Sequence, residues 1–86
     1  MLYQIRIRHA DGSIIADDEG SEFGSAEEAL ENVRRSAGEM IGERLRFGKS
    51  VPYRAFELAD TKGNIIETIT PEDVIRWAAG RLDPSS

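Results

Sequence analysis

The chain has 86 residues, 16 acidic and 11 basic, for a net charge of −5, and it contains no cysteine. This length suits one hydrophobic core, so we expect a single domain over residues 1–80 and a frayed tail over residues 81–86. Without cysteine there is no disulfide and no thiolate metal site or nucleophile. The acidic balance makes nucleic-acid binding an unfavoured function, because that binding depends on Lys and Arg. No apolar run is long enough to span a bilayer and the first residues lack a signal-peptide pattern, so we expect a cytoplasmic protein.

Residues 2–9 alternate between apolar and polar side chains, which is the pattern of a half-buried strand. The apolar face consists of Tyr3, Ile5 and Ile7. Asp11-Gly12 is a typical hairpin turn and predicts a return strand over residues 13–16. The acidic bend of residues 17–22 follows, and a further short extended piece is predicted to end at Phe23.

A long amphipathic helix is predicted from Ser25 to about Phe47. Ser25 and Glu28 have the spacing of a capping box, and Gly48 suits the position after the helix end. Apolar residues recur at alternating spacings of four and three and form a broad stripe on one side. The stripe consists of Ala26, Leu30, Val33, Ala37 and Met40, flanked by Ala29, Ile41 and Leu45.

Three residues of this helix do not fit a simple core-facing stripe. Gly38 and Gly42 each cost about 1 kcal/mol relative to alanine in a helix. Both lie near one edge of the stripe, where close approach of another backbone would explain them. Arg44 projects near the middle of the stripe, so we expect either that the stripe runs past the end of the sheet or that this side chain snorkels.

A second hairpin and a short helix complete the chain. Residues 54–60 alternate again, residues 60–64 form a polar turn, and residues 65–70 are the predicted return strand. Thr70 then caps a short helix that we expect to end at Gly80. The resulting α+β fold has the order ββαββα, with the long helix on one face of a small antiparallel sheet.

Motifs that would indicate chemistry are incomplete. Gly48-Lys49-Ser50 resembles the end of a phosphate-binding loop, but it leaves a helix and lacks the glycine that the motif requires at position 43. The acidic bend from Asp17 to Glu22 does not have calcium-loop spacing, so a solvated turn is favoured over a cation site. His9 is the only histidine and has no evident catalytic partner. We therefore predict a protein that is not an enzyme and holds no metal or cofactor.

Two further features are open to more than one interpretation. Arg6 and Arg8 could form a basic binding stripe, but neutralisation by Glu57 on a neighbouring strand is the simpler expectation. Trp77 lies at the flank of the short helix, where it could contact a partner or cover the end of its own sheet.

The layout resembles a family of short bacterial proteins of unknown function, frequent in rhizobial-type α-proteobacteria. The resemblance spans residues 2–70, and its most specific part is the acidic bend with glycine before the long helix. The residues that carry it are Tyr3, Ile5, Ile7, Asp11, Gly12, Asp17, Glu19, Gly20, Glu22, Ala26, Ala29, the strand Ala55-Phe56-Glu57-Leu58 and Gly63. The resemblance implies a bacterial cytoplasmic origin and no assigned activity.

Residues 20–32 are also similar to the segment that opens the helix of HicB-like antitoxin domains. That similarity implies a small toxin as partner. The leading expectation is instead a non-enzymatic protein-interaction module, possibly homodimeric. Its interaction surface is predicted at Gly38, Gly42, Arg44 and Trp77.

Overall fold

Within the residues that it describes, 1–16 and 19–81, a computed structural model has seven elements in chain order. They are β1 (Leu2–His9), β2 (Ile14–Ala16), β3 (Ser21–Glu22), α1 (Ala26–Arg46), β4 (Tyr53–Ala59), β5 (Ile65–Ile69) and α2 (Pro71–Arg81). The predicted α+β class and ββαββα order are confirmed, and the two-residue β3 is the extended piece expected before Phe23. Asp17, Asp18 and the predicted tail beyond residue 81 lie outside the described residues.

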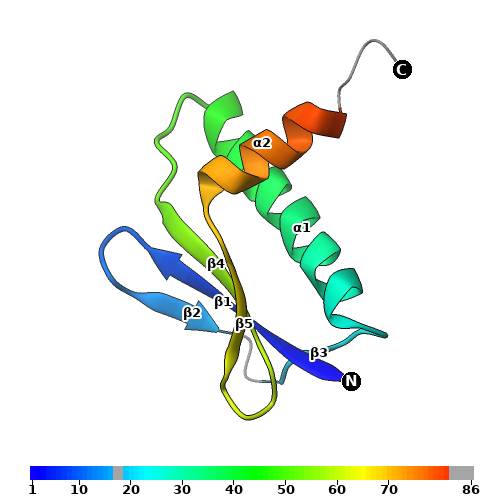
Figure 1. Cartoon of the computed structure of the whole chain (residues 1–86). Coiled ribbons are helices and arrows are strands. Elements are labelled where there is room, and N and C mark those ends of the chain that lie inside the picture. Colours follow the sequence, from blue (N-terminus) through cyan, green and yellow to red (C-terminus); the bar gives the residue numbers. More distant parts are fainter. Residues whose placement is uncertain (17–18, 82–86) are drawn as a thin grey trace.

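The strands form an antiparallel sheet in the order β2-β1-β4-β5. β1 is central: β4 pairs with one of its edges, while β2 and the shorter β3 pair with the other. α1 crosses one face of this sheet and α2 lies across the C-terminal half of α1 (Figure 1). Because α1 separates β1 and β4 in the chain, their pairing depends on the tertiary fold and not on a hairpin turn.

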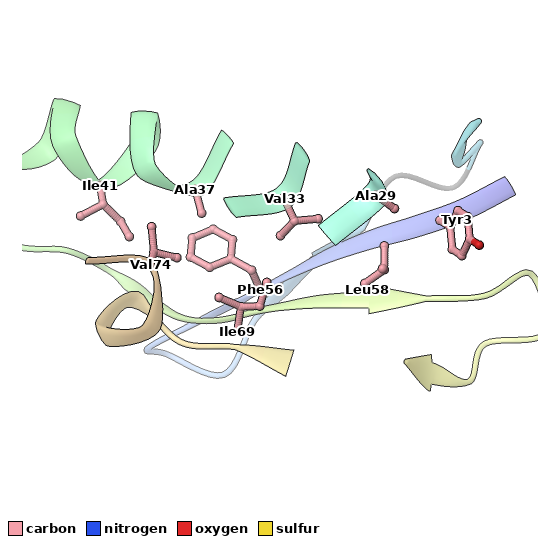
Figure 2. Close-up of a cluster of buried hydrophobic side chains, with 9 residues drawn as sticks. All are labelled: Tyr3, Ala29, Val33, Ala37, Ile41, Phe56, Leu58, Ile69 and Val74. Carbon is pink, nitrogen blue, oxygen red and sulfur yellow. The ribbon is translucent and has the colours of Figure 1, made fainter. Parts of the chain in front are cut away.

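The core lies between α1 and the covered face of the sheet (Figure 2). The helix contributes a row of residues at a spacing of four, and the sheet contributes the alternate positions that face it. The buried cluster consists of Tyr3, Ala29, Val33, Ala37, Ile41, Phe56, Leu58, Ile69 and Val74. Leu45, expected at the flank of the stripe, is 57% exposed and is not among the buried residues of α1.

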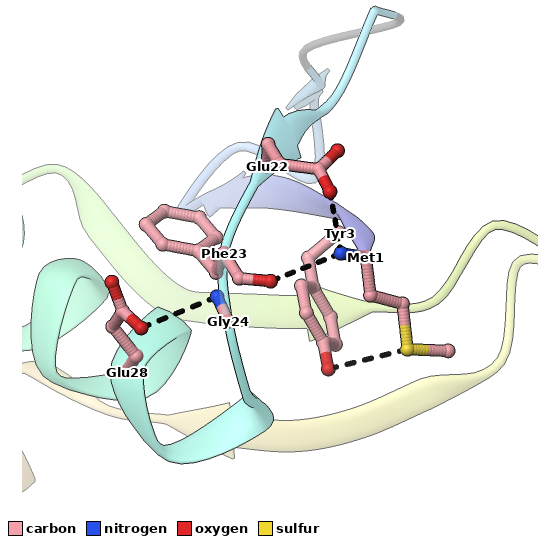
Figure 3. Close-up of polar contacts among 6 residues, drawn as sticks. All are labelled: Met1, Tyr3, Glu22, Phe23, Gly24 and Glu28. Carbon is pink, nitrogen blue, oxygen red and sulfur yellow. Dashed lines mark hydrogen bonds and ion pairs between the residues drawn. The ribbon is translucent and has the colours of Figure 1, made fainter.

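The segment that enters α1 is held by polar contacts to the start of β1 (Figure 3). The Met1 amino group donates to the Glu22 carboxylate at 2.6 Å and to the Phe23 carbonyl oxygen at 3.1 Å. Ser25 caps the helix by accepting from the Glu28 N–H, as predicted. The Glu28 carboxylate accepts from the Gly24 N–H and not from the Ser25 N–H, so the reciprocal bond of the cap falls one residue earlier than in the standard motif.

Gly20 is required by the backbone at the bend before α1. Its φ of +75° lies in the left-handed region, and a Cβ at this position would lie 3.1 Å from the Tyr3 carbonyl oxygen. We expect Gly20→Ala to lower the free energy of unfolding by about 2 kcal/mol, since strain and a backbone contact add together. Gly63 has a φ of +86° but open space around its Cβ position, so Gly63→Ala should cost only about 1 kcal/mol. Urea denaturation of both variants measures the difference, and equal losses would contradict the close approach at Gly20.

α2 begins with a complete capping box. The Asp73 N–H donates to the Thr70 hydroxyl oxygen and the Asp73 carboxylate accepts from the Thr70 N–H, which lowers the pKa of Asp73 below its usual value. The helix continues through Gly80 to Arg81, so the predicted end at Gly80 is one residue early. Gly80 does not have a positive φ, so it continues the helix and does not end it.

Candidate functional site

An apolar groove runs between the C-terminal half of α1 and the exposed side of α2. It has a volume of about 270 Å³. Its lining residues carry no charge and no polar side-chain atom. They are Gly38, Ile41, Gly42 and Leu45 from α1, and Val74, Ile75, Ala78 and Ala79 from α2.

Packing of α2 on α1 creates this groove. Val74 is buried in the core between the helix and the sheet (Figure 2), which fixes the position of α2. Ile75, the next residue, therefore points away from the core and is 53% exposed. On α1, Leu45 is exposed to a similar degree, so both walls of the groove carry a large apolar side chain in contact with solvent.

The two glycines of α1 lie on the floor of the groove. Neither has a positive φ, so the backbone does not require glycine at these positions. A Cβ on Gly38 would be 3.7 Å from Val74 Cγ1, which is an ordinary contact, and a Cβ on Gly42 would meet nothing within 4 Å. Within the described residues no backbone makes the expected close approach: α2 passes Gly38 at side-chain distance and leaves Gly42 uncovered.

The other two residues of the predicted surface lie elsewhere. Arg44 lines a separate hollow on another side of α1, and its Nε–H donates to the Ser50 carbonyl oxygen at 2.9 Å. It is half-buried. Trp77 lies on the far side of α2, beside β5, where it is half-buried. The structure thus brings together Gly38 and Gly42 and separates Arg44 and Trp77 from them.

Sequence reasoning missed the α2 wall of the groove. Ile75, Ala78 and Ala79 belong to the apolar side of a short helix, together with the buried Val74. This apolar side is wider than a single contact with the core can bury. Its width was the sequence signal that part of α2 would remain as an exposed apolar wall.

The open face of the sheet carries a charged cluster instead of an apolar one. Glu57 is 7% exposed and lies between Arg6 and Arg8. Its carboxylate oxygens are 3.3 Å from an Arg8 terminal nitrogen and 3.8 Å from Arg6 Nε. The predicted neutralisation across strands is confirmed.

Among residues 1–16 and 19–81, no group of three or more His, Cys, Asp or Glu side chains is placed where it could hold a metal ion. No helix in the same part of the chain is both long enough and apolar enough to cross a bilayer. The apolar groove offers no group for acid–base or nucleophilic chemistry, and what it can do is bury apolar surface of another molecule.

These features define a small α+β domain with a sheet covered on one face and an apolar groove between its helices. The chain belongs to the family described as Domain of unknown function (DUF6894), whose model matches residues 2–70. The match ends before α2, so the α1 wall of the groove lies within the family region and the α2 wall lies after it. Comparison with curated proteins and with solved structures found no significant match.

Proposed function

We propose that this chain is a non-enzymatic protein-interaction module that forms a homodimer through the groove between α1 and α2. The observation that carries the proposal is the exposure of Leu45 and Ile75 on either side of an uncharged glycine floor. Exposed apolar surface of this kind, contiguous and without polar groups, is typical of a protein contact.

Gly42 supports the proposal because nothing within the described chain explains it. Alanine would fit at this position and would favour the helix by about 1 kcal/mol. Absence of a Cβ allows the backbone of a second helix to approach more closely than alanine would. A partner helix packed over Gly42 would account for a glycine at this position, whereas the isolated fold does not.

A second copy suits this surface because the groove has projecting side chains on its walls and a depression over its glycine floor. In a two-fold interface the same patch meets itself, so Ile75 of one copy can enter the space above Gly42 of the other, and the reverse. The groove residues are uncharged, so two chains of net charge −5 can meet here with little direct repulsion. A domain of this length also gains from additional buried area.

Gly42→Ala tests the proposal with two readouts of opposite sign. We expect the unfolding free energy of the dilute protein to rise by about 1 kcal/mol, while self-association weakens at least about tenfold. Sedimentation equilibrium over a concentration series measures association, and thermal or urea denaturation at low concentration measures stability. Ser36→Ala is the control, because Ser36 is exposed on the opposite side of α1 from the groove.

Two results would contradict the homodimer. One is a wild-type chain that stays monomeric at high micromolar concentration. The other is a Gly42→Ala variant that associates as strongly as wild type and Ser36→Ala.

The alternative occupant is a small toxin, as the similarity to HicB-like antitoxin domains implies. The order of a hairpin, α1 and then β4 agrees with the arrangement of those domains. Native mass spectrometry of the protein purified from its own cell distinguishes the two: a homodimer has twice the chain mass, and an antitoxin carries a second, basic chain encoded by a neighbouring gene. The setting we propose is the bacterial cytoplasm, supported by the lack of cysteine, which suits a reducing compartment.

A further inference from the structure

A second concavity, which we call the Arg44 hollow, lies where α1 ends and β4 begins. Its volume is about 400 Å³. It is lined by Met40, Glu43, Arg44, Phe47, Lys49 and Tyr53. None of these residues lines the groove between α1 and α2, so this is a separate surface.

Arg44 is positioned by the loop that follows the helix. Its Nε–H is bonded to the Ser50 carbonyl oxygen, which holds the guanidinium in place. Its two terminal nitrogens make no hydrogen bond or ion pair to any residue in the described ranges 1–16 and 19–81. A guanidinium with two parallel donors available matches the two oxygens of a carboxylate.

The lining of the Arg44 hollow is net positive, although the whole chain has a net charge of −5. Arg44 and Lys49 line the hollow, and Glu43 is its one acidic lining residue. The end of α1 contributes about half a negative charge, which is smaller than this excess of cations. The last helix carbonyls are also occupied, because they accept from the backbone N–H groups of residues 47–49.

The remaining walls of the Arg44 hollow are apolar or aromatic. Phe47 is 65% exposed, which is unusual for phenylalanine. Tyr53 is held by ring contacts to His9 and Phe56, with centroids 5.5 and 5.6 Å away. Met40 adds a flexible side chain that can adapt to different shapes. The hollow therefore combines a carboxylate-binding fork with a surface for an apolar side chain.

We propose that the Arg44 hollow binds an acidic peptide segment of a partner protein, with a carboxylate on Arg44 and an adjacent apolar side chain against Phe47. The positive charge of the hollow favours a carboxylate of the peptide, and the exposed Phe47 ring favours an apolar side chain next to that carboxylate. Nucleic acid fits less well, because it needs cations along an extended phosphate track. Here two cations line one hollow on a chain of net charge −5.

Fluorescence anisotropy with a short labelled peptide containing Glu-Phe-Glu tests the proposal. We expect binding that falls at least about tenfold when the peptide carries Gln-Phe-Gln, because a charge-assisted bidentate contact is lost. Phe47→Ala and Lys49→Ala should each weaken binding several-fold, and both positions are exposed, so the fold should persist in both variants. Arg44→Lys keeps the charge but removes the fork, and should weaken binding about tenfold.

Lys62→Ala is the matched control for Lys49→Ala. It removes the same charge from an exposed residue in the turn between β4 and β5, at the other end of the sheet, and should leave binding unchanged. The proposal is overturned if the wild-type protein does not bind the Glu-Phe-Glu peptide at millimolar concentration. Equal weakening by Lys62→Ala and Lys49→Ala would also overturn it, as would tighter binding of a labelled oligothymidine than of the peptide. Sedimentation of the same variants separates this site from the dimer, because none of these changes touches the groove.

Discussion

Replacement of Phe56 by alanine is expected to lower the free energy of unfolding by about 3–5 kcal/mol. Phe56 is 2% exposed on β4, between β1 and β5, and its ring points toward α1 (Figure 2). Removal of the ring leaves a cavity at the centre of the cluster, and the cavity adds to the loss of buried apolar surface. A domain of this size has a total stability of about 5–15 kcal/mol, so the loss in Phe56→Ala is a large fraction of the whole.

Phe47→Ala is the matched control for this loss. It removes the same ring from a position that is 65% exposed, and should change stability by no more than about 0.5 kcal/mol. Denaturant titration monitored by circular dichroism compares the two variants directly. Similar midpoints for Phe56→Ala and Phe47→Ala would contradict the location of the core.

Removal of both arginines from the open face of the sheet is expected to have the second largest effect. In the double variant Arg6→Ala/Arg8→Ala, the Glu57 carboxylate loses both cations. The Glu57 side chain is only 9% exposed, and its Oε1 atom is buried without a hydrogen bond even in the wild type. Because an unpaired buried charge is costly, we expect a loss of about 3 kcal/mol in unfolding free energy at neutral pH.

Two comparisons isolate the buried carboxylate as the cause. Addition of Glu57→Gln to the double variant should recover a substantial part of the loss, because the unpaired charge is gone. Arg35→Ala/Arg76→Ala removes two cations from exposed ion pairs and should cost less than about 1 kcal/mol in total. A triple variant no more stable than Arg6→Ala/Arg8→Ala would show that the arginine side chains stabilise by packing and not by charge.

The three surfaces of this domain differ in chemistry as well as in place. The sheet face opposite the helices holds Glu57 in ion pairs with Arg6 and Arg8, the groove between α1 and α2 is uncharged, and the Arg44 hollow is basic with an aromatic wall. Charged partners and apolar partners would therefore reach different sides of the molecule. The proposed dimer and the proposed peptide contact can coexist in one assembly.

Local signals in the chain accounted for most of the secondary structure. Alternation at every second residue located β1 and β4, and the cap at Ser25 with Gly48 beyond the end located α1 to within a residue or two. Thr70 located the start of α2 in the same way. These signals act between residues at most four positions apart, where backbone geometry alone decides which side chains meet.

The candidate sites depended on contacts that no local signal contains. Gly38 and Gly42 were identifiable as unusual in a helix, but only the docking of α2 across α1 made them the floor of a groove walled by Ile75. Arg44 was identifiable as misplaced, but its bond to Ser50 depends on the path of the loop after α1.

Residue types and spacing therefore settled the elements, their order and the α+β class of this protein. The tertiary structure decided the strand order β2-β1-β4-β5, the passage of α2 over Gly38, and the separation of Arg44 and Trp77 from the groove. The physical reason is that packing of distant segments depends on the fit of whole surfaces, here chiefly the burial of Val74 between α1 and the sheet. Such a fit is a property of the assembled chain and not of any short stretch of it.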